Sequence, residues 1–221
     1  MATQAIASYG TQLRLGNGVA LAPLAVSAAT NATPIVVTTP AHGIAIGDVT
    51  WVTVAGVLGN GGANGTWVAQ SLTTTTLRLR GSVGTGAYTS GGTVTILDTF
   101  TTVAELVNIT PIGISFNMVD ASAHDGNGWG TSIPTFKRGV DMRVEVNLVP
   151  AHATHNGTTG FIGLALGKIR RDWLIVLSDA GKTTVAFQAW VSDHGTVTPF
   201  DNVLRANPVL SIDGKMEWSY S

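Results

Sequence analysis

Short apolar or β-branched stretches, separated by glycine-rich turns, recur along this chain and limit its fold more than any other feature. Five of them fall between residues 34 and 96, where turn clusters such as "HGIAIGD" and "GNGGAN" separate them. The five stretches are residues 35–38, 49–54, 65–69, 76–80 and 93–96. Strands of this length and spacing are typical of a small barrel or sandwich, and helical periodicity is absent. This region therefore predicts a small all-β domain.

The clearest half-buried strand is expected at residues 141–149. Alternate positions there are apolar, namely Met142, Val144, Val146 and Leu148. This is the pattern of a strand with one face in a core and the other in solvent. Further strands are expected at 8–15, at 100–110 with Glu105 breaking the strand, and near the C-terminus. Outside the small domain, the chain is therefore also expected to be mainly β.

Residues 178–187, "SDAGKTTVAF", contain Gly-Lys-Thr, the end of a phosphate-binding loop. A complete loop needs a first glycine five residues before the second, and that position is Val176. The lysine should also open a helix, whereas a period-two pattern follows Thr184 and the apolar run "WLIVL" precedes the turn. The segment therefore predicts strand, Asp-Ala-Gly-Lys turn and strand, and no nucleotide site.

The chain has few charged residues, which bears on the partners it can bind. Asp, Glu, Lys and Arg make up 11% of its 221 residues, against about a quarter in typical domains, and the formal net charge is −1. No basic field is available to hold DNA phosphates, so a sequence-independent nucleic-acid binder is not expected. The absence of cysteine excludes disulfides and thiolate chemistry. The chain start lacks a signal-peptide pattern and no apolar run approaches about 18 residues, so no membrane association is expected.

Residues 120–139, "DASAHDGNGWGTSIPTFKRG", are expected to form a long polar loop between two strand regions. Compact domains rarely keep such a loop unless it has a function. Asp120, His124 and Asp125 could ligate a hard or borderline metal, but their spacing matches no recognised calcium loop. No metal site is therefore expected.

The segment 151–169 holds the one helix that we expect. Phe161, Leu164, Ala165 and Ile169 have roughly helical spacing, although the glycines around them make the helix weak. His152 and His155 before it lack the Glu of a zincin motif and are interpreted as helix-start and turn residues.

No catalytic set emerges from the remaining residues. Ser178 has no nucleophile-elbow sequence around it, and no carboxylate pair has the spacing that glycosidases need. Asp193-His194-Gly195 is interpreted as a turn at a strand end. The chain is accordingly expected to be no enzyme and to bind no cofactor. Six tryptophans are present, and most are expected in the core or at interfaces.

Several segments outside residues 19–98 form a recognisable series. In chain order they are "AIASYGTQLRLGNG", "TFTTVAELVNITPIGIS", the Asp-to-Trp loop ending in "KRG", the alternating strand, "ATHN", "RDWLIVLSDAGKTTVAFQAW" and "LSIDG". Together they resemble the major tail (tail tube) proteins of long, flexible-tailed bacteriophages of the siphophage type. The resemblance covers residues 1–18 and 99–221, and residues 19–98 look like a small β module inserted into the first loop.

The resemblance implies a tail-tube-type β-sandwich with one flanking helix, formed by residues 1–18 and 99–221. The inserted barrel-like or immunoglobulin-like domain, residues 19–98, would sit on the tube exterior. The implied function is that of a structural virion protein, assembled in the host cytoplasm. Its hexameric rings would stack into the channel through which DNA passes during genome ejection. Implied partners are other copies of the chain, the tail tip initiator, the tape measure and terminator proteins, and transiently passing double-stranded DNA.

The resemblance also nominates residues. The 120–139 loop would be an inter-subunit arm, with the interface residues Asp120, His124, Asp125, Trp129, Ile133, Phe136, Lys137 and Arg138. Candidate lumen-facing acids are Glu105, Asp141 and Glu145. The alternative function is a carbohydrate- or cell-surface-binding β module of a phage tail or secreted protein, which the six tryptophans and the inserted domain suggest. A β-rich hydrolase using Asp120, His124 and Asp125 is a further alternative.

Overall fold

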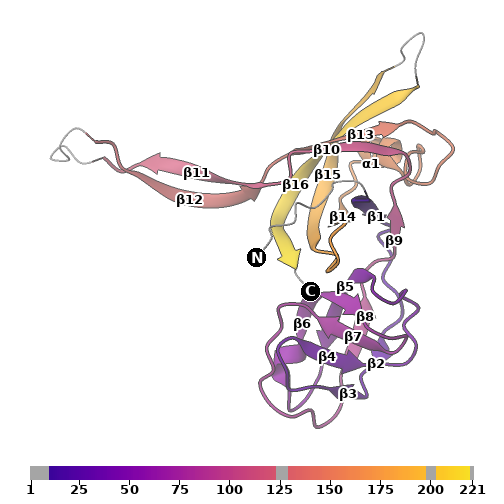
Figure 1. The fold of residues 1–221 in the computed structure, drawn as a ribbon, viewed down its shortest axis with the longest axis vertical. Helices are drawn as coiled ribbons and strands as arrows, with labels where there is room; N and C mark the ends of the chain where they lie inside the picture. The colour runs from indigo at the N-terminus through magenta and orange to yellow at the C-terminus, as the bar shows by residue number, and fades with distance from the viewer. Residues whose placement is uncertain (1–9, 123–128, 198–202, 220–221) are drawn as a thin grey trace. The chain divides into compact units, whose positions relative to one another are not determined.

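A computed structural model of the chain describes residues 10–122, 129–197 and 203–219 (Figure 1). The protein is mainly β, as expected, with curled antiparallel sheets and one α-helix in the described part of the chain. The chain forms two compact units. Unit 1 comprises Met1–Thr102, Arg171–Ala186 and Glu217–Ser221, and unit 2 comprises Val103–Arg170 and Phe187–Met216.

Unit 1 contains a seven-stranded antiparallel sheet that lies within the expected insertion. Its order is β2-β8-β5-β6-β7-β4-β3. The strands are β2 (Leu24–Ala25), β3 (Ala28–Ala29), β4 (Ile35–Thr38), β5 (Val49–Ala55), β6 (Gly65–Ser71), β7 (Thr76–Leu79) and β8 (Thr93–Ile96). All five strands expected from the sequence are therefore confirmed, with end shifts of at most two residues. Inward side chains from these strands, such as Ile35, Val52 and Leu77, form the core of this sheet.

Unit 1 also contains the strands that flank the insertion. β1 (Gln12–Gly16) pairs with both β9 (Phe100–Thr102) and β14 (Arg171–Val176). A second buried cluster joins Val49 and Val68 of the β2–β8 sheet to Leu174, Val176 and Ala186. The division of the chain at residues 19–98 stays a prediction, because the compact units group residues 1–102 together.

Unit 2 contains β10 (Leu106–Thr110), β13 (Met142–Asn147), α1 (Phe161–Gly167) and most of β15 (Thr184–Val197) and β16 (Arg205–Ser219). These strands belong to a second seven-stranded sheet with the order β10-β13-β16-β15-β14-β1-β9. Met142, Val144 and Val146 are fully buried, so the predicted alternation of β13 is confirmed. α1 is shorter than the segment that predicted it, because turns occupy residues 150–160. No helix in the described ranges is long and apolar enough to cross a membrane.

The turns that the sequence predicted are partly confirmed. The Asp-Ala-Gly-Lys turn joins β14 to β15, with Lys182 at φ 48° donating its N–H to the Asp179 carbonyl at 2.9 Å. Glu105 does break the strand: its φ is 52°, and it lies between β9 and β10. The turn expected at Asp193–His194 is wrong, because β15 continues to Val197 beside β16. Ser192 donates to the Val209 carbonyl there at 3.3 Å.

The prediction of a long loop at residues 120–139 is also wrong. β11 (Ile114–Asp120) and β12 (Ser132–Gly139) form an antiparallel hairpin, so only residues 121–131 lie between strands. The hairpin is a separate two-stranded sheet. A strand that is exposed on both faces shows no one-sided burial pattern, and the glycine and polar content of this segment suggested a loop instead.

Candidate assembly surface

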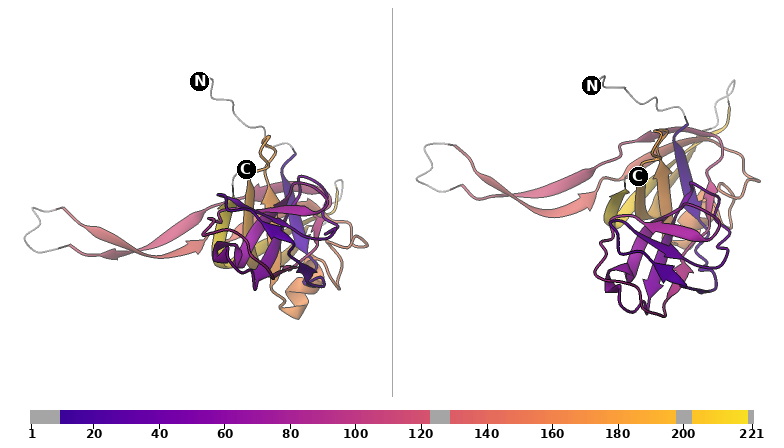
Figure 2. Two further views of the ribbon diagram at one scale, coloured as in Figure 1. Left: turned by 90° about the horizontal axis from the view of Figure 1, so that it is seen from below. Right: turned by 60° about the horizontal axis from the view of Figure 1, so that its bottom comes forward.

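The hairpin of β11 and β12, called the arm below, extends away from β10, β13 and α1 of its own unit (Figure 1). Two further views show it as a twisted two-stranded ribbon (Figure 2). The pairing runs from Ile114 opposite Gly139 to Asp120 opposite Ser132, with a register shift between Phe116 and Met118. Nearly every arm residue is exposed, so neither face of this hairpin is covered by the rest of the described chain.

The arm carries large apolar side chains in solvent. The exposed ones are Ile114, Phe116, Met118, Val119, Trp129, Ile133 and Phe136. Trp129 is 85% exposed and Phe136 is 79% exposed. Contiguous exposed apolar side chains on a soluble protein mark interaction sites, and aromatic anchors carry much of the energy of such sites.

Local hydrogen bonds order the described ends of the arm's connection. The Ser122 N–H donates to Asp120 Oδ1 at 2.9 Å, and the Ser122 hydroxyl donates to the same oxygen. These bonds hold the pKa of Asp120 below its usual range. On the other side, the Thr131 N–H donates to Ser122 Oγ at 2.9 Å, and the Ala121 N–H donates to the Thr131 carbonyl at 2.7 Å. Asp120 thus shapes the hairpin end, in addition to any contact with a partner.

The structure places six of the eight nominated interface residues on the arm or its connection: Asp120, Trp129, Ile133, Phe136, Lys137 and Arg138. His124 and Asp125 lie outside the described residues. Lys137 Nζ lies 6.0 Å from the centre of the Phe116 ring, and the two residues are cross-strand partners. Phe116 and Met118 were missed from the sequence, although Ile114, Phe116 and Met118 alternate with Ser115 and Asn117.

The three candidate lumen acids are placed in unit 2, and each has its own partner. Glu105 accepts a hydrogen bond from Asn147 Nδ2 at 3.3 Å. Asp141 accepts one from the Ser211 hydroxyl at 2.9 Å, and Glu145 pairs with Arg205 at 2.5 Å.

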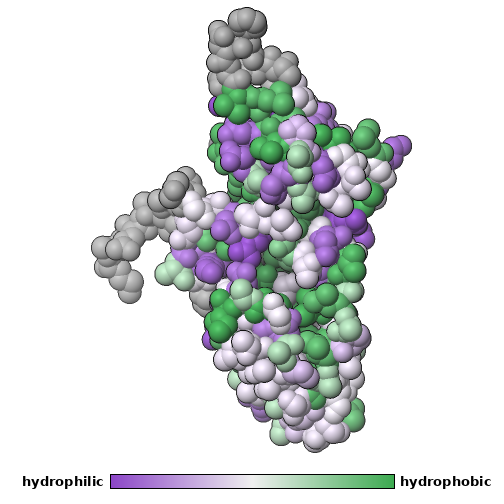
Figure 3. Space-filling model, turned by 90° about the vertical axis from the view of Figure 1, so that its right-hand side faces the viewer, coloured by the Kyte–Doolittle hydropathy of each residue, from purple (hydrophilic) through white to green (hydrophobic). Residues whose placement is uncertain are grey.

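The outward side of β13 carries mixed rather than acidic charge. Arg143, Glu145 and Asn147 alternate with the buried residues of this strand. Across the pairing, Arg143 lies opposite Val209 and Asn147 opposite Arg205 of β16. This sheet face is therefore polar and close to neutral. On the molecular face in Figure 3, residues of intermediate hydropathy are common, and strongly hydrophilic and hydrophobic ones are interspersed, in keeping with the 11% charged content.

A buried histidine fixes the turns that precede α1. His155 is fully buried and His152 is half-buried, 5.7 Å apart between ring centres. The Val149 N–H donates to His155 Nδ1 at 3.0 Å, which leaves the proton on Nε2 to be donated to the Ala104 carbonyl at 3.0 Å. Burial lowers the pKa of His155. The hydrogen bond to the Ala104 carbonyl opposes this shift, and the neighbouring His152 lowers the pKa further. The residue is thus a neutral structural tether, and not a ligand.

This tether predicts a stability loss in mild acid. The pKa of His155 in the folded protein lies below its ordinary value of 6.5. The contribution of His155 to the free energy of unfolding is therefore fully present above pH 6.5 and is lost as the pH falls through the folded pKa. Replacing His155 with Ala should cost roughly 1–3 kcal/mol at pH 7.5, since Val149 and Ala104 lose their partners. Urea unfolding of both chains at pH 7.5 and pH 5 checks this. An equal pH dependence in the two chains would contradict it.

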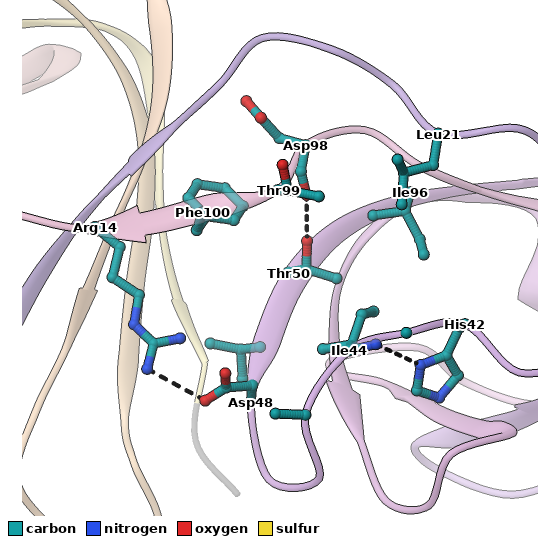
Figure 4. A pocket seen from close by; sticks show the side chains of 13 residues that line it. Arg14, Leu21, His42, Ile44, Asp48, Thr50, Ile96, Asp98, Thr99 and Phe100 are labelled. Carbon is teal, nitrogen blue, oxygen red and sulfur yellow. Dashed lines mark hydrogen bonds and ion pairs between the residues drawn. The ribbon is translucent and has the colours of Figure 1, made fainter. Parts of the chain in front are cut away.

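A small pocket of about 240 Å³ lies in unit 1 (Figure 4). Three of its polar wall residues, Arg14, Asp48 and His42, are already engaged. Arg14 Nη2 contacts Asp48 Oδ1 at 3.2 Å, and Arg14 also donates to Gln12. His42 Nδ1 accepts the Ile44 N–H at 3.2 Å. Within the described ranges, no group of three or more His, Asp or Glu residues is arranged to hold a metal ion.

Comparison with known proteins gives limited similarity. No family model matches the chain, and no curated protein matches it. A chain in the cryo-EM structure of the anti-feeding prophage baseplate, six-fold symmetrised, is similar in structure at 12% sequence identity and a TM-score of 0.45. The alignment covers 54% of this chain and 83% of that chain. The proposal for the function therefore rests on this chain's own residues.

Proposed function

We propose that the protein is a structural subunit of a phage tail tube, which self-associates into stacked hexameric rings around a channel for DNA. The order of its sequence motifs, which resembles that of tail tube proteins, supports the type of assembly. In this proposal the chain is not an enzyme and needs no cofactor. Its further partners are the tail tip initiator, the tape measure and the terminator proteins.

The observation that carries the proposal is the arm. A two-stranded hairpin is only marginally stable in water, and three strands or a packing partner are needed for independent stability. This hairpin projects from its unit and exposes Phe116, Trp129 and Phe136 on its surface. Docking of the arm on another protein surface would remove these side chains from water and stabilise the hairpin. The proposed partner is a second copy of the chain.

A contact of this kind extends readily into an assembly of many copies. An arm that docks on a different surface of the next copy makes a heterologous contact, which generates a ring or a helical stack. In the described part of the chain, β9 and β10 are the end strands of the seven-stranded sheet that contains β13, and neighbours could also cover their open edges. The low charge of the chain fits extensive contacts with copies of itself, because few charged groups would have to be desolvated.

The outward face of β13 and β16 is the proposed channel lining. Glu145 and Arg205 neutralise each other there, and the neighbouring positions are mainly polar. Such a face offers few cations to hold phosphates, so DNA could pass without being retained. The proposed lining keeps Glu145, one of the candidate lumen-facing acids, but is nearly neutral because Arg205 pairs with it.

Sedimentation velocity over a wide concentration range tests the proposal. The expected result is a monomer at low concentration and, at high concentration, a species of six times the 22.8 kDa chain mass together with larger polymers. A single monomeric species at every concentration, in a folded sample, would count against self-association through the arm.

A further inference from the structure

Two chain segments form the connection through which the chain enters and leaves the β2–β8 sheet. These segments, residues 16–21 and 96–100, are called the neck. Backbone hydrogen bonds join them: the Asn17 N–H donates to the Thr99 carbonyl at 3.1 Å, and the Leu21 N–H donates to the Ile96 carbonyl at 2.9 Å. Because all of these residues belong to unit 1, the neck is a local structure within one compact unit.

A carboxyl group lies buried in the neck. Asp98 is 1% exposed, and its Oδ1 accepts the Gly18 N–H at 2.9 Å. Its main-chain carbonyl accepts the Thr50 hydroxyl at 3.0 Å, which ties the neck to β5. Figure 4 shows the carboxyl group pointing away from His42 and Ile44. Asp98 therefore links the entering segment, the leaving segment and the β2–β8 sheet.

The second carboxyl oxygen of Asp98, unlike the first, accepts no hydrogen bond from the described residues. Asp98 Oδ2 is buried and has no hydrogen-bond partner in the described part of the chain. It packs against Gly16: a Cβ placed on that glycine would lie 2.1 Å from Oδ2 and 3.0 Å from the Asp172 carbonyl oxygen. The Asp172 carbonyl oxygen, which is an acceptor, thus borders the same crowded space beside Gly16. A protonated Oδ2 would supply the donor that this crowded space lacks.

The charges around Asp98 are mixed. Asp172 of β14 repels the ionised carboxylate, whereas the Arg171 guanidinium lies beside Gly18. Arg14 of β1 is paired with Asp48 ahead of β5, so those two charges largely cancel. Burial raises the pKa of Asp98 to about 6. The Gly18 N–H opposes this rise, Asp172 adds to it, and the backbone N–H groups of Asn17 and Thr99 oppose it further.

We propose that Asp98 is a proton-dependent lock on the neck, which closes when Oδ2 is protonated and loosens when the carboxyl group ionises. In the protonated form, Oδ1 still accepts from Gly18 and Oδ2 gains a proton to donate. In the ionised form, a buried negative charge with one unsatisfied oxygen faces Asp172. The β2–β8 sheet is then held less firmly to the strands that flank it.

The raised pKa of Asp98 determines whether the neck is more stable at low or at high pH. The folded pKa of about 6 lies above the ordinary 3.8, so the folded neck binds the proton more tightly than an opened neck does. The stabilising contribution is complete below about pH 4 and is lost as the pH rises through 6. The lock therefore responds in the opposite direction to the His155 tether of unit 2.

Amide hydrogen exchange, corrected for the intrinsic effect of pH, tests the lock on the full chain. The readout is the protection of the Gly18 and Leu21 amides at pH 5 and pH 7.5. The wild-type protection should fall about tenfold between the two pH values, because a group with a pKa of about 6 is about ten times more protonated than ionised at pH 5 and almost fully ionised at pH 7.5. Asp98→Asn, whose amide imitates the protonated acid, should keep the high protection at both pH values.

The matched control is Asp193→Asn, the same change at an exposed position of β15. This variant should follow the wild type. Unchanged wild-type protection, or the same fall in Asp98→Asn, would overturn the proposal. If Asp98→Asn does not fold by circular dichroism, the Asp98 carboxyl carbon is titrated by NMR in the wild type. A midpoint near 6 supports the lock, and a midpoint at or below about 4, the ordinary range of Asp, overturns it.

Discussion

Replacing Trp129 and Phe136 together with alanine should abolish self-association and leave the monomer folded. Both side chains are almost wholly in solvent in the isolated chain, at 85% and 79% exposure, so their removal leaves no cavity. Exposed substitutions usually change the free energy of unfolding by less than about 0.5 kcal/mol. In an assembled interface, truncation of an aromatic anchor costs about 2 kcal/mol or more, which weakens association roughly thirtyfold for each residue.

Sedimentation velocity and circular dichroism of the double variant measure the two effects separately. Leu166→Ala is the matched control, because Leu166 is 77% exposed but lies on α1, away from the arm. It should assemble as the wild type does. Normal assembly of the double variant, or an equal loss in the Leu166 variant, would show that the arm is not the association surface.

Deleting residues 22–96 and closing the neck with a short glycine-serine linker should destabilise the rest of the chain. The sequence suggested a small β module inserted into the first loop, whose deletion should spare tube formation if the module is only a decoration. The structure shows Val49 and Val68 covering Leu174 and Val176 in a shared buried cluster. Exposing those two side chains should cost roughly 1.5–3 kcal/mol each in the free energy of unfolding. Chemical denaturation of the two chains measures this difference.

A second pair of variants isolates the cause. Leu174→Thr with Val176→Thr should cost several kcal/mol in the full chain, where both positions are buried, because apolar volume is lost and hydroxyls are buried. The same pair should cost much less in the deleted chain, where both positions are in solvent. Equal costs in the two backgrounds, or a deleted chain as stable as the full one, would mean that the shared cluster does not contribute.

The sequence predicted those parts of the fold in which local signals agree with burial. The strands between residues 35 and 96 were found because glycine and asparagine clusters mark each turn, and β13 because one of its faces is buried. β12 was taken for part of a loop because its residues do not alternate between apolar and polar and because glycine and polar residues precede it. The cluster of Val49 with Leu174 brings together strands that are far apart in sequence, and no local pattern reports such a contact.

The candidate site was predicted less completely than the fold. Trp129, Ile133 and Phe136 were nominated as apolar residues in an otherwise polar segment, and the structure places them on an exposed hairpin with Phe116 and Met118. Their role in an interface stays a prediction. The nominated acids could not be assigned to a lining, because the partners that neutralise Glu145 and hold Asp141 lie on β16, sixty and seventy positions later in the sequence.

The most direct test of the central claim is negative-stain electron microscopy of the purified full chain at high concentration, beside the Trp129 and Phe136 double variant. The account predicts hollow rings with six-fold symmetry, or tubes built from them, in the wild type, and dispersed particles in the variant. Wild-type particles that stay dispersed, or rings without a central channel, would contradict a tube-forming subunit.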